Sequence, residues 1–297
     1  MQFSWINHDF KRIMLKKFLK RHGVSHRLFN VVKHSGLLQL NGKTVHVSLP
    51  MQRGDRATIT MPAEKSDPRL KISQGPLTVR YEDANWLVID KPAGLTSVPG
   101  PSNRSDTLLN RIKGYVQIHH EPNLRPHLVT RLDRFTSGVV LVAKHRLASS
   151  LANRLILQNR LRKEYLALVS GHLKHRHGQI RMPIGKRPDE IRRHYMKDGK
   201  PAWTEYRVVR TYPKFTEVRV RLHTGRTHQI RVHFTETGHP LLGDRLYRGP
   251  MHLGIPRQAL HAQKLSFPDP FSKHTLSFQS PLPNDMKRVL NSAEALL

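Results

Sequence analysis

The sequence predicts an α+β fold in two unequal domains, the larger one built on a mixed, largely antiparallel sheet with a central cleft. Strand-like runs outnumber helical ones after residue 76 and do not alternate with them regularly, which argues against a doubly wound sheet. Within the first 62 residues, apolar residues change from helical spacing to alternation, as expected for helices followed by a β-hairpin. The chain of 297 residues is long enough for such a pair of domains.

The predicted small domain, residues 1–62, is strongly basic. It holds 11 Lys and Arg residues against 2 Asp residues, so its formal charge is 11 − 2 = +9. Apolar spacing predicts one helix within residues 11–21 and a second helix after Gly23. Asn41-Gly42 lies between alternating apolar residues that end at Val47, and this dipeptide favours the type I′ turn of a hairpin.

Residues 63–75 are polar, contain one proline and lack periodicity, so we expect a linker there and a second domain over residues 76–297. A stripe of Leu, Ile and Ala repeating every four residues predicts a helix over residues 145–158. The expected strands are 77–81, 86–90, 139–142, 165–169, 204–209, 217–222, 259–265 and 275–278.

The net charge predicts a polyanionic partner. Lys and Arg number 51 against 21 Asp and Glu, a formal charge of +30. Nucleic acid is the commonest such partner, because cations that neutralise phosphates release counterions, and an anionic membrane surface is the rival. No apolar segment of the chain is long enough to span a membrane or to mark export, so we expect no membrane partner. The absence of cysteine excludes disulfides and thiolate sites and fits a cytoplasmic protein.

Several cofactor and metal motifs are absent. The sequence contains no GxGxxG, GxxxxGK[ST], HExxH or GxSxG pattern, which removes support for dinucleotide, P-loop, zincin and α/β-hydrolase chemistry. The chain has 20 histidines, but His223, His228 and His233 are spaced by five, so neither a strand nor a helix would bring them together. We therefore expect no metal and no cofactor.

Asp133 is the candidate chemical group. It lies between Arg131 and Arg134, just before a Thr-Ser-Gly turn and an apolar strand. Flanking arginines favour the ionised carboxylate, the state in which it could attack an electron-poor carbon. From these residues alone, a structural Arg–Asp pair that fixes the turn explains the pattern equally well.

Four sequence motifs resemble those of RNA pseudouridine synthases of the large-subunit ribosomal type (RluA/RluD-like). The segment RLDRFTSGVVLVAK at 131–144 is similar to the family's aspartate motif, and YEDANWLVIDKPAG at 81–94 to its opening strand and Lys-Pro-x-Gly loop. KEYLALVSG at 163–171 is similar to its tyrosine motif, and LHTGRTHQIRVH at 222–233 with GHPLLGD at 238–244 to its third. Residues 11–59 look like the small α-L RNA-binding module that many members carry. Thr130 and Phe135 depart from the family, which often has histidine and a polar residue there.

The resemblance implies isomerisation of uridine in RNA without a cofactor: the bond from the sugar to nitrogen breaks, uracil turns, and its fifth carbon rejoins the ribose. Asp133 would be the nucleophile or proton acceptor, by attack on sugar or base or by elimination. Tyr165 would stack on uracil, although a core aromatic is the plain alternative. Arg231 would pair with Asp133, where the alternative is a phosphate contact. Arg131 would fill the space that a flipped base leaves.

We expect a monomer whose partner is RNA, with ribosomal RNA favoured and transfer RNA possible. A non-catalytic ribosome-assembly protein and a glycosidase for small nucleosides remain alternatives; the combination of Asp133, Tyr165 and Arg231 argues against the first and the basic N-terminal domain against the second. The residues expected to contact RNA are Lys16, Lys17, Arg27, Arg131, Arg134, Arg162, Lys163 and Arg226.

Overall fold

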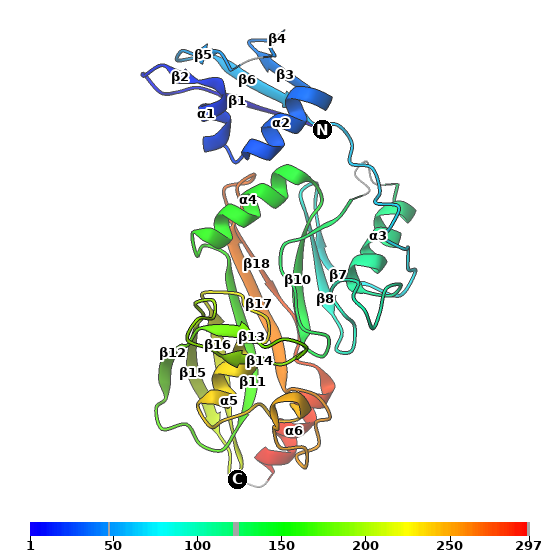
Figure 1. Cartoon of the computed structure of the whole chain (residues 1–297), viewed down its shortest axis with the longest axis vertical. Helices are drawn as coiled ribbons and strands as arrows, with labels where there is room; N and C mark the ends of the chain where they lie inside the picture. The colour runs from blue at the N-terminus through cyan, green and yellow to red at the C-terminus, as the bar shows by residue number, and fades with distance from the viewer. Residues whose placement is uncertain (47, 121–124, 296–297) are drawn as a thin grey trace.

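The computed structural model describes residues 1–46, 48–120 and 125–295 (Figure 1). A four-stranded sheet lies in the N-terminal unit, residues 1–62, and a ten-stranded sheet forms the body, residues 76–295. The strands of the large sheet pair antiparallel except β10 and β17, which run parallel. The predicted α+β class and the mixed, mostly antiparallel sheet are therefore confirmed.

The N-terminal unit packs two helices against its small sheet, whose strand order is β1-β6-β3-β4. The predicted turn is present, because β3 pairs with β4 through Asn41 and Gly42, both at positive φ. The first helix begins at Leu15 rather than Lys11, because Ile13 and Met14 form a short strand against β5. Val47 lies outside the described residues. The elements are β1 (Gln2–Ile6), β2 (Ile13–Met14), α1 (Leu15–Arg21), α2 (His26–Ser35), β3 (Leu37–Leu40), β4 (Lys43–Thr44), β5 (Pro50–Met51) and β6 (Arg56–Thr60).

The body contains all eight strands and the helix expected from the sequence. The sheet order is β12-β15-β16-β11-β17-β10-β8-β7, with β18 beside β17 and β9 beside β10. The elements are β7 (Thr78–Glu82), β8 (Trp86–Lys91), α3 (Leu108–Ile118), β9 (His127–Leu128), β10 (Ser137–Ala143), α4 (Arg146–Leu157), β11 (Arg162–Ser170), β12 (His177–Arg181), β13 (Ile184–Lys186), β14 (Arg193–Tyr195), β15 (Trp203–Thr211), β16 (Phe215–Leu222), α5 (Gln229–Glu236), β17 (Leu260–Pro268), β18 (Thr275–Gln279) and α6 (Asn284–Glu294).

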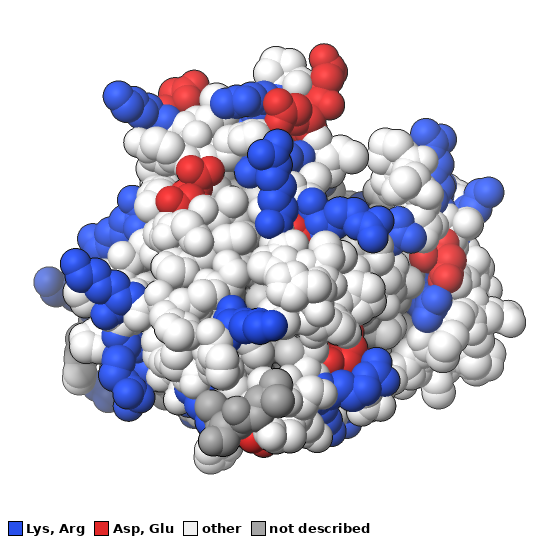
Figure 2. Space-filling model, turned by 90° about the horizontal axis from the view of Figure 1, so that it is seen from below, with Lys and Arg blue, Asp and Glu red and all other residues white. Residues whose placement is uncertain are grey.

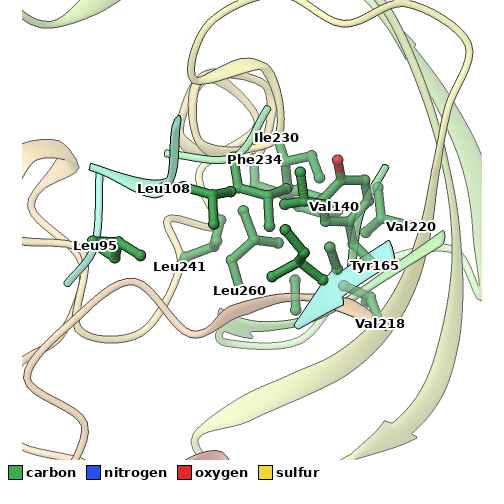
Figure 3. Packing of buried hydrophobic residues seen from close by; sticks show 14 of the residues in the cluster. Leu95, Leu108, Val140, Tyr165, Val218, Val220, Ile230, Phe234, Leu241 and Leu260 are labelled. Carbon is green, nitrogen blue, oxygen red and sulfur yellow. The ribbon is translucent and has the colours of Figure 1, made fainter. Parts of the chain in front are cut away.

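The central strands are apolar at nearly every position because both faces of the sheet are covered. In β8, Trp86 and Val88 face a core shared with α4, whereas Leu87 and Ile89 face a core shared with α3 and α5. Successive strand residues point to opposite faces, so a strand between two cores loses the polar alternation. Figure 3 shows part of the second core, with side chains from the sheet packed against Leu108 of α3 and residues of α5.

The N-terminal unit rests on α4, which lies between it and the large sheet (Figure 1). Leu147 and Leu151 of α4 pack into the N-terminal core, and the Ser150 hydroxyl donates to the carbonyl of Gly23 at 2.8 Å. Residues 63–75 form no helix or strand, but Glu64 is buried and accepts two hydrogen bonds from Arg146. The segment between the two sheets is therefore fastened to α4.

Candidate active site

A cavity of about 540 Å³ opens on the body where four loop and strand segments meet. It is lined by the loop between β8 and α3, the loop before β10, the start of β11, and the loop that leads into α5. The lining residues used below are Ser97, Arg131, Asp133, Arg134, Lys163, Tyr165, Arg226, His228 and Arg231.

Asp133 lies in the turn before β10, and its side chain is about a quarter exposed in the cavity. Its carbonyl accepts from the backbone N–H of Thr136, which closes the turn. Leu132, the preceding residue, is held on both sides of its peptide: its N–H donates to the Ser97 hydroxyl at 3.1 Å, and that hydroxyl donates to its carbonyl at 2.6 Å. The backbone beside the carboxylate is therefore fixed from across the cavity.

Lys91 explains the Lys-Pro-x-Gly motif. Its side chain is fully buried, and its ammonium donates to the carbonyls of Pro92, Leu95 and Arg134. The N–H of Gly94 donates to the same Arg134 carbonyl at 2.9 Å. Burial lowers the pKa of Lys91 to about 7, an effect that the nearby Asp133 carboxylate opposes. The motif thus ties its own loop to the aspartate loop, a role that the spacing alone did not indicate.

Arg231 of α5 is buried between two carboxylates. Its Nε and Nη2 donate to Asp244 at 2.7 and 2.9 Å, and its Nη1 donates to Asp133 at 3.2 Å. Asp244 is only 1% exposed, and among the described residues Arg231 is the one ion-pair partner of its carboxylate. The sequence did not assign Asp244 a role, although it ends the third motif. Its two shorter bonds aim the remaining guanidinium nitrogen at Asp133.

His228 is a second neighbour that the sequence analysis missed. It precedes α5 in the left-handed conformation, with φ 58°, and its Nε2 lies 3.9 Å from the Asp133 carboxylate. Its Nδ1 lies 3.1 Å from the hydroxyl of Tyr247, whose ring is 4.8 Å from the Arg231 guanidinium. Burial lowers the pKa of His228, which favours the neutral imidazole beside the cavity.

Tyr165 of β11 lines the cavity from the side of the sheet. Its ring is buried among Val140, Val220 and Ile230, and its hydroxyl lies at the edge of this cluster (Figure 3). Burial and the Asp133 carboxylate raise the pKa of Tyr165, so the hydroxyl stays protonated at neutral pH. The structure therefore brings Asp133, Tyr165 and Arg231 to one cavity.

The other residues expected to contact RNA fall into two groups. Arg131, Arg134, Lys163 and Arg226 line the cavity, and Arg131, Arg134 and Arg226 are exposed. Lys16, Lys17 and Arg27 are exposed on α1 and α2, and Arg162 is exposed at the start of β11. On the end of the molecule at the bottom of Figure 1, Lys and Arg stand apart with acidic side chains among them, so this face carries no single basic patch (Figure 2).

Metal and membrane features are absent from the parts of the chain that the structure describes. No three His, Asp or Glu side chains gather there as a metal site, and no described helix is long and apolar enough to cross a bilayer. His223 is 2.8 Å from Glu205, whereas His233 is hydrogen-bonded to Thr204, so these two histidines and His228 do not share a ligand.

Comparison with known proteins decides the family. A family model described as RNA pseudouridylate synthase matches residues 85–236. An RNA pseudouridine synthase of Bacillus subtilis (strain 168), YjbO, is 38% identical over 93% of this chain and 98% of its own length. The chain belongs to the RNA pseudouridine synthase family. Ribosomal large subunit pseudouridine synthase D of Vibrio parahaemolyticus is 34% identical over 94% of this chain and 85% of its own.

Solved structures agree on the fold of this pseudouridine synthase. Human RNA pseudouridylate synthase domain containing 4 superposes with a TM-score of 0.61, at 23% identity over 73% of this chain and 93% of that chain. The family model and the relatives above, and not this likeness of fold, show that the protein is an isomerase that makes pseudouridine in RNA. The family match includes Asp133, Tyr165 and Arg231, and every lining residue of the cavity except Leu260 lies within the matched region.

Proposed function

We propose that this pseudouridine synthase modifies uridines of large-subunit ribosomal RNA and that Asp133 is its catalytic nucleophile or proton acceptor. The observation that carries the chemical part is Asp133 itself, the one carboxylate among the described residues that line the cavity, 3.2 Å from a buried arginine that is fixed by Asp244. The relatives named as large-subunit ribosomal enzymes support the choice of RNA. Transfer RNA is the second candidate substrate.

The arrangement suits an isomerisation better than hydrolysis. A hydrolytic glycosidase ordinarily uses two carboxylates on opposite sides of the bond. Here Asp244 is buried and occupied by Arg231, which leaves Asp133 to act. Cleavage of the bond between ribose and the uracil nitrogen, rotation of uracil, and bond formation at its fifth carbon leave the composition unchanged: the proton lost from that carbon is balanced by one gained at the freed nitrogen. Attack on the sugar, attack on the base and elimination all use the Asp133 carboxylate.

Tyr165 and Arg131 complete the proposal. The buried Tyr165 ring offers a flat face for uracil, and its protonated hydroxyl can donate a hydrogen bond. A base inside an RNA helix must leave the stack before it can turn, which requires a few kcal/mol. Arg131 is exposed at the cavity, which supports the proposal that it occupies the space that the base leaves.

Chemical mapping of pseudouridines in total RNA, with and without the gene, tests the substrate. Loss of sites in large-subunit ribosomal RNA supports the proposal, whereas loss confined to transfer RNA selects the second candidate. Complementation with Asp133→Asn tests the chemistry, and the exposed Asp189→Asn provides the matched control. We expect no modification with Asp133→Asn and full modification with the control. A rate within about tenfold of wild type, a barrier change of about 1.4 kcal/mol, would show that Asp133 is not the chemical group.

A further inference from the structure

Lys163 lies on the same face of β11 as Tyr165. Both residues lie in β11 with one residue between them, and Lys163 is paired there with Leu265 of β17, so the two side chains point to the same side of the sheet. Both line the catalytic cavity. Two residues of strand span about 7 Å, so Lys163 begins about 7 Å along the cavity wall from the tyrosine.

The ammonium of Lys163 has no protein counter-ion. Within residues 1–46, 48–120 and 125–295, its Nζ forms no ion pair with a carboxylate and donates no hydrogen bond to a protein acceptor. The group lies against Gly225, where an added Cβ would be 3.3 Å from the Nζ. Burial lowers the pKa of Lys163, with no charged neighbour contributing. A desolvated cation without a partner is unfavourable, so an anion from outside the chain is its natural complement.

The rest of the cavity indicates where such an anion would come from. Asp133 and Tyr165 mark the place of the uracil base, and the exposed cations Arg131 and Arg226 lie on the cavity lining. Displacement of Lys163 from Tyr165 along the strand is comparable with the separation between the base of a nucleotide and its own phosphate. The loop at Gly225 leaves room for close approach, since this residue is exposed and has no side chain.

We propose that Lys163 binds a phosphate of the nucleotide whose base contacts Tyr165, and so sets how deeply the flipped uridine enters the cavity. This inference rests on the proposed catalysis at Asp133. Lys163 is then a positioning residue for the reacting sugar, and its contact is a charge-assisted hydrogen bond to a phosphodiester oxygen. The same ammonium reaching a uracil carbonyl instead is an outcome that the test separates.

The test pairs a protein change with a change in a single phosphate. Lys163→Met keeps an unbranched side chain one atom shorter than lysine and removes its charge. Lys264→Met makes the same change on the neighbouring strand β17, where Lys264 pairs with Glu164 on the opposite face. The substrates are RNA hairpins that contain a uridine identified by the mapping experiment. One hairpin is unmodified, and the others carry one neutral methylphosphonate on the 5′ or the 3′ side of that uridine.

For wild type, one of the two methylphosphonates should lower the second-order rate by roughly 10- to 100-fold, the effect of losing one charge-assisted hydrogen bond. Lys163→Met should show the same loss on unmodified RNA and no further loss with that methylphosphonate. Lys264→Met should behave as wild type with both RNAs. Independent losses that multiply in Lys163→Met would overturn the proposal, because the lysine and the phosphate would then act separately.

A direct binding experiment tests the role of Lys163 separately from the proposed catalysis at Asp133. Uridine, uridine 5′-monophosphate and uridine 3′-monophosphate are titrated into the whole wild-type protein and into Lys163→Met. One monophosphate should bind wild type more tightly than uridine does, and this preference should vanish in the variant. Equal binding of all three compounds to wild type would refute the role of Lys163 even if the RNA is modified. A preference that disappears in the variant would support it even if no mapped RNA were converted.

Discussion

Asp244→Asn is the sharpest test of how the site holds its arginine. The carboxylate accepts two bonds from Arg231, at 2.7 and 2.9 Å, and it is buried. Asparagine keeps the shape and one acceptor oxygen but removes the charge and turns the second contact toward an amide N–H. Loss of one charge-assisted bond corresponds to about 1.5–3 kcal/mol, or roughly 10- to 100-fold in rate where the geometry is needed in the transition state.

The direction of the effect follows from competition for the guanidinium. With Asp244 ionised, only one nitrogen of Arg231 reaches Asp133, at 3.2 Å. Without that charge, the guanidinium is free to turn toward Asp133 and to occupy the oxygens that should act on the nucleotide. We therefore expect Asp244→Asn to convert RNA more slowly in single-turnover reactions at saturating RNA. Its affinity for RNA should stay close to wild type, because Asp244 and Arg231 are both buried away from the RNA phosphates.

Asp106→Asn is the matched control, since Asp106 also accepts two bonds from an arginine, Arg111, outside the cavity. Both variants should lower the melting temperature, but only Asp244→Asn should slow the chemical step. If the two variants convert RNA at equal rates, the positioning role of Asp244 is wrong. If Asp244→Asn loses RNA affinity instead, Arg231 belongs to the binding surface and not to the catalytic group.

Three further predictions concern folding. Burial lowers the pKa of His145 from 6.5 to about 4, so its contribution to the free energy of unfolding is complete above pH 6.5 and falls by up to about 3 kcal/mol toward pH 4. In urea titrations, His145→Asn, which keeps a helix cap, should lack that part of the decline in the free energy of unfolding, and an unchanged dependence on pH would contradict this. Gly138→Ala should lower the stability of the protein in thermal melting by about 2–5 kcal/mol, because φ is 116° and the new Cβ would be 2.2 Å from a carbonyl oxygen of β17. The control Gly254→Ala, with open space at its Cβ, should lower the stability by about 1 kcal/mol, and equal losses in the two variants would refute the steric cause. Leu151→Asp should make the N-terminal unit more sensitive to limited proteolysis, because Leu151 packs into its core, and unchanged digestion would show that this contact is unimportant.

The strands were predictable because burial on both faces leaves long apolar runs. The run at residues 139–142 and the stripe that forms α4 gave the correct elements and almost the correct ends. By contrast, α5 was not assigned, since polar and apolar residues alternate along its buried part, where Gln229, Arg231 and His233 are as buried as the apolar residues between them. A helix that supplies polar side chains to a site loses the periodicity by which amphipathic helices are recognised.

The residues proposed for the active site divide in the same way. Asp133, Tyr165 and Arg231 were assigned through motifs whose order and spacing resemble one family, and the cavity brings them together. The parts played by His228 and Asp244 depend on contacts with residues distant in the chain, which spacing does not reveal. Asp244 stands in a recognised motif, so its negative charge near Arg231 in the sequence was the signal that could have indicated an ion pair.

The backbone of the loop that carries Asp133 is held at three positions, one before and two after the aspartate, by residues from other parts of the chain. These contacts are Ser97 with Leu132, Lys91 and Gly94 with the carbonyl of Arg134, and Arg257 with the carbonyl of Phe135 at 3.0 Å. Each contact uses a main-chain atom, so the side chains at positions 131 and 133 are left free to face the cavity.

This tethering explains why Arg131 and Asp133 alternate with a buried leucine. Leu132 is 8% exposed and packs in the core, which turns its two neighbours toward the opening. A nucleotide that has left its helix can adopt many conformations. A site stabilises the transition state best when its own groups are already held in the reactive geometry before the nucleotide binds. The carboxylate is fixed by its backbone, and Arg231 holds it with a single bond. Asp133 is thereby oriented by the protein, and among the described residues only Arg231 donates a hydrogen bond to its carboxylate, which suits the role proposed for it.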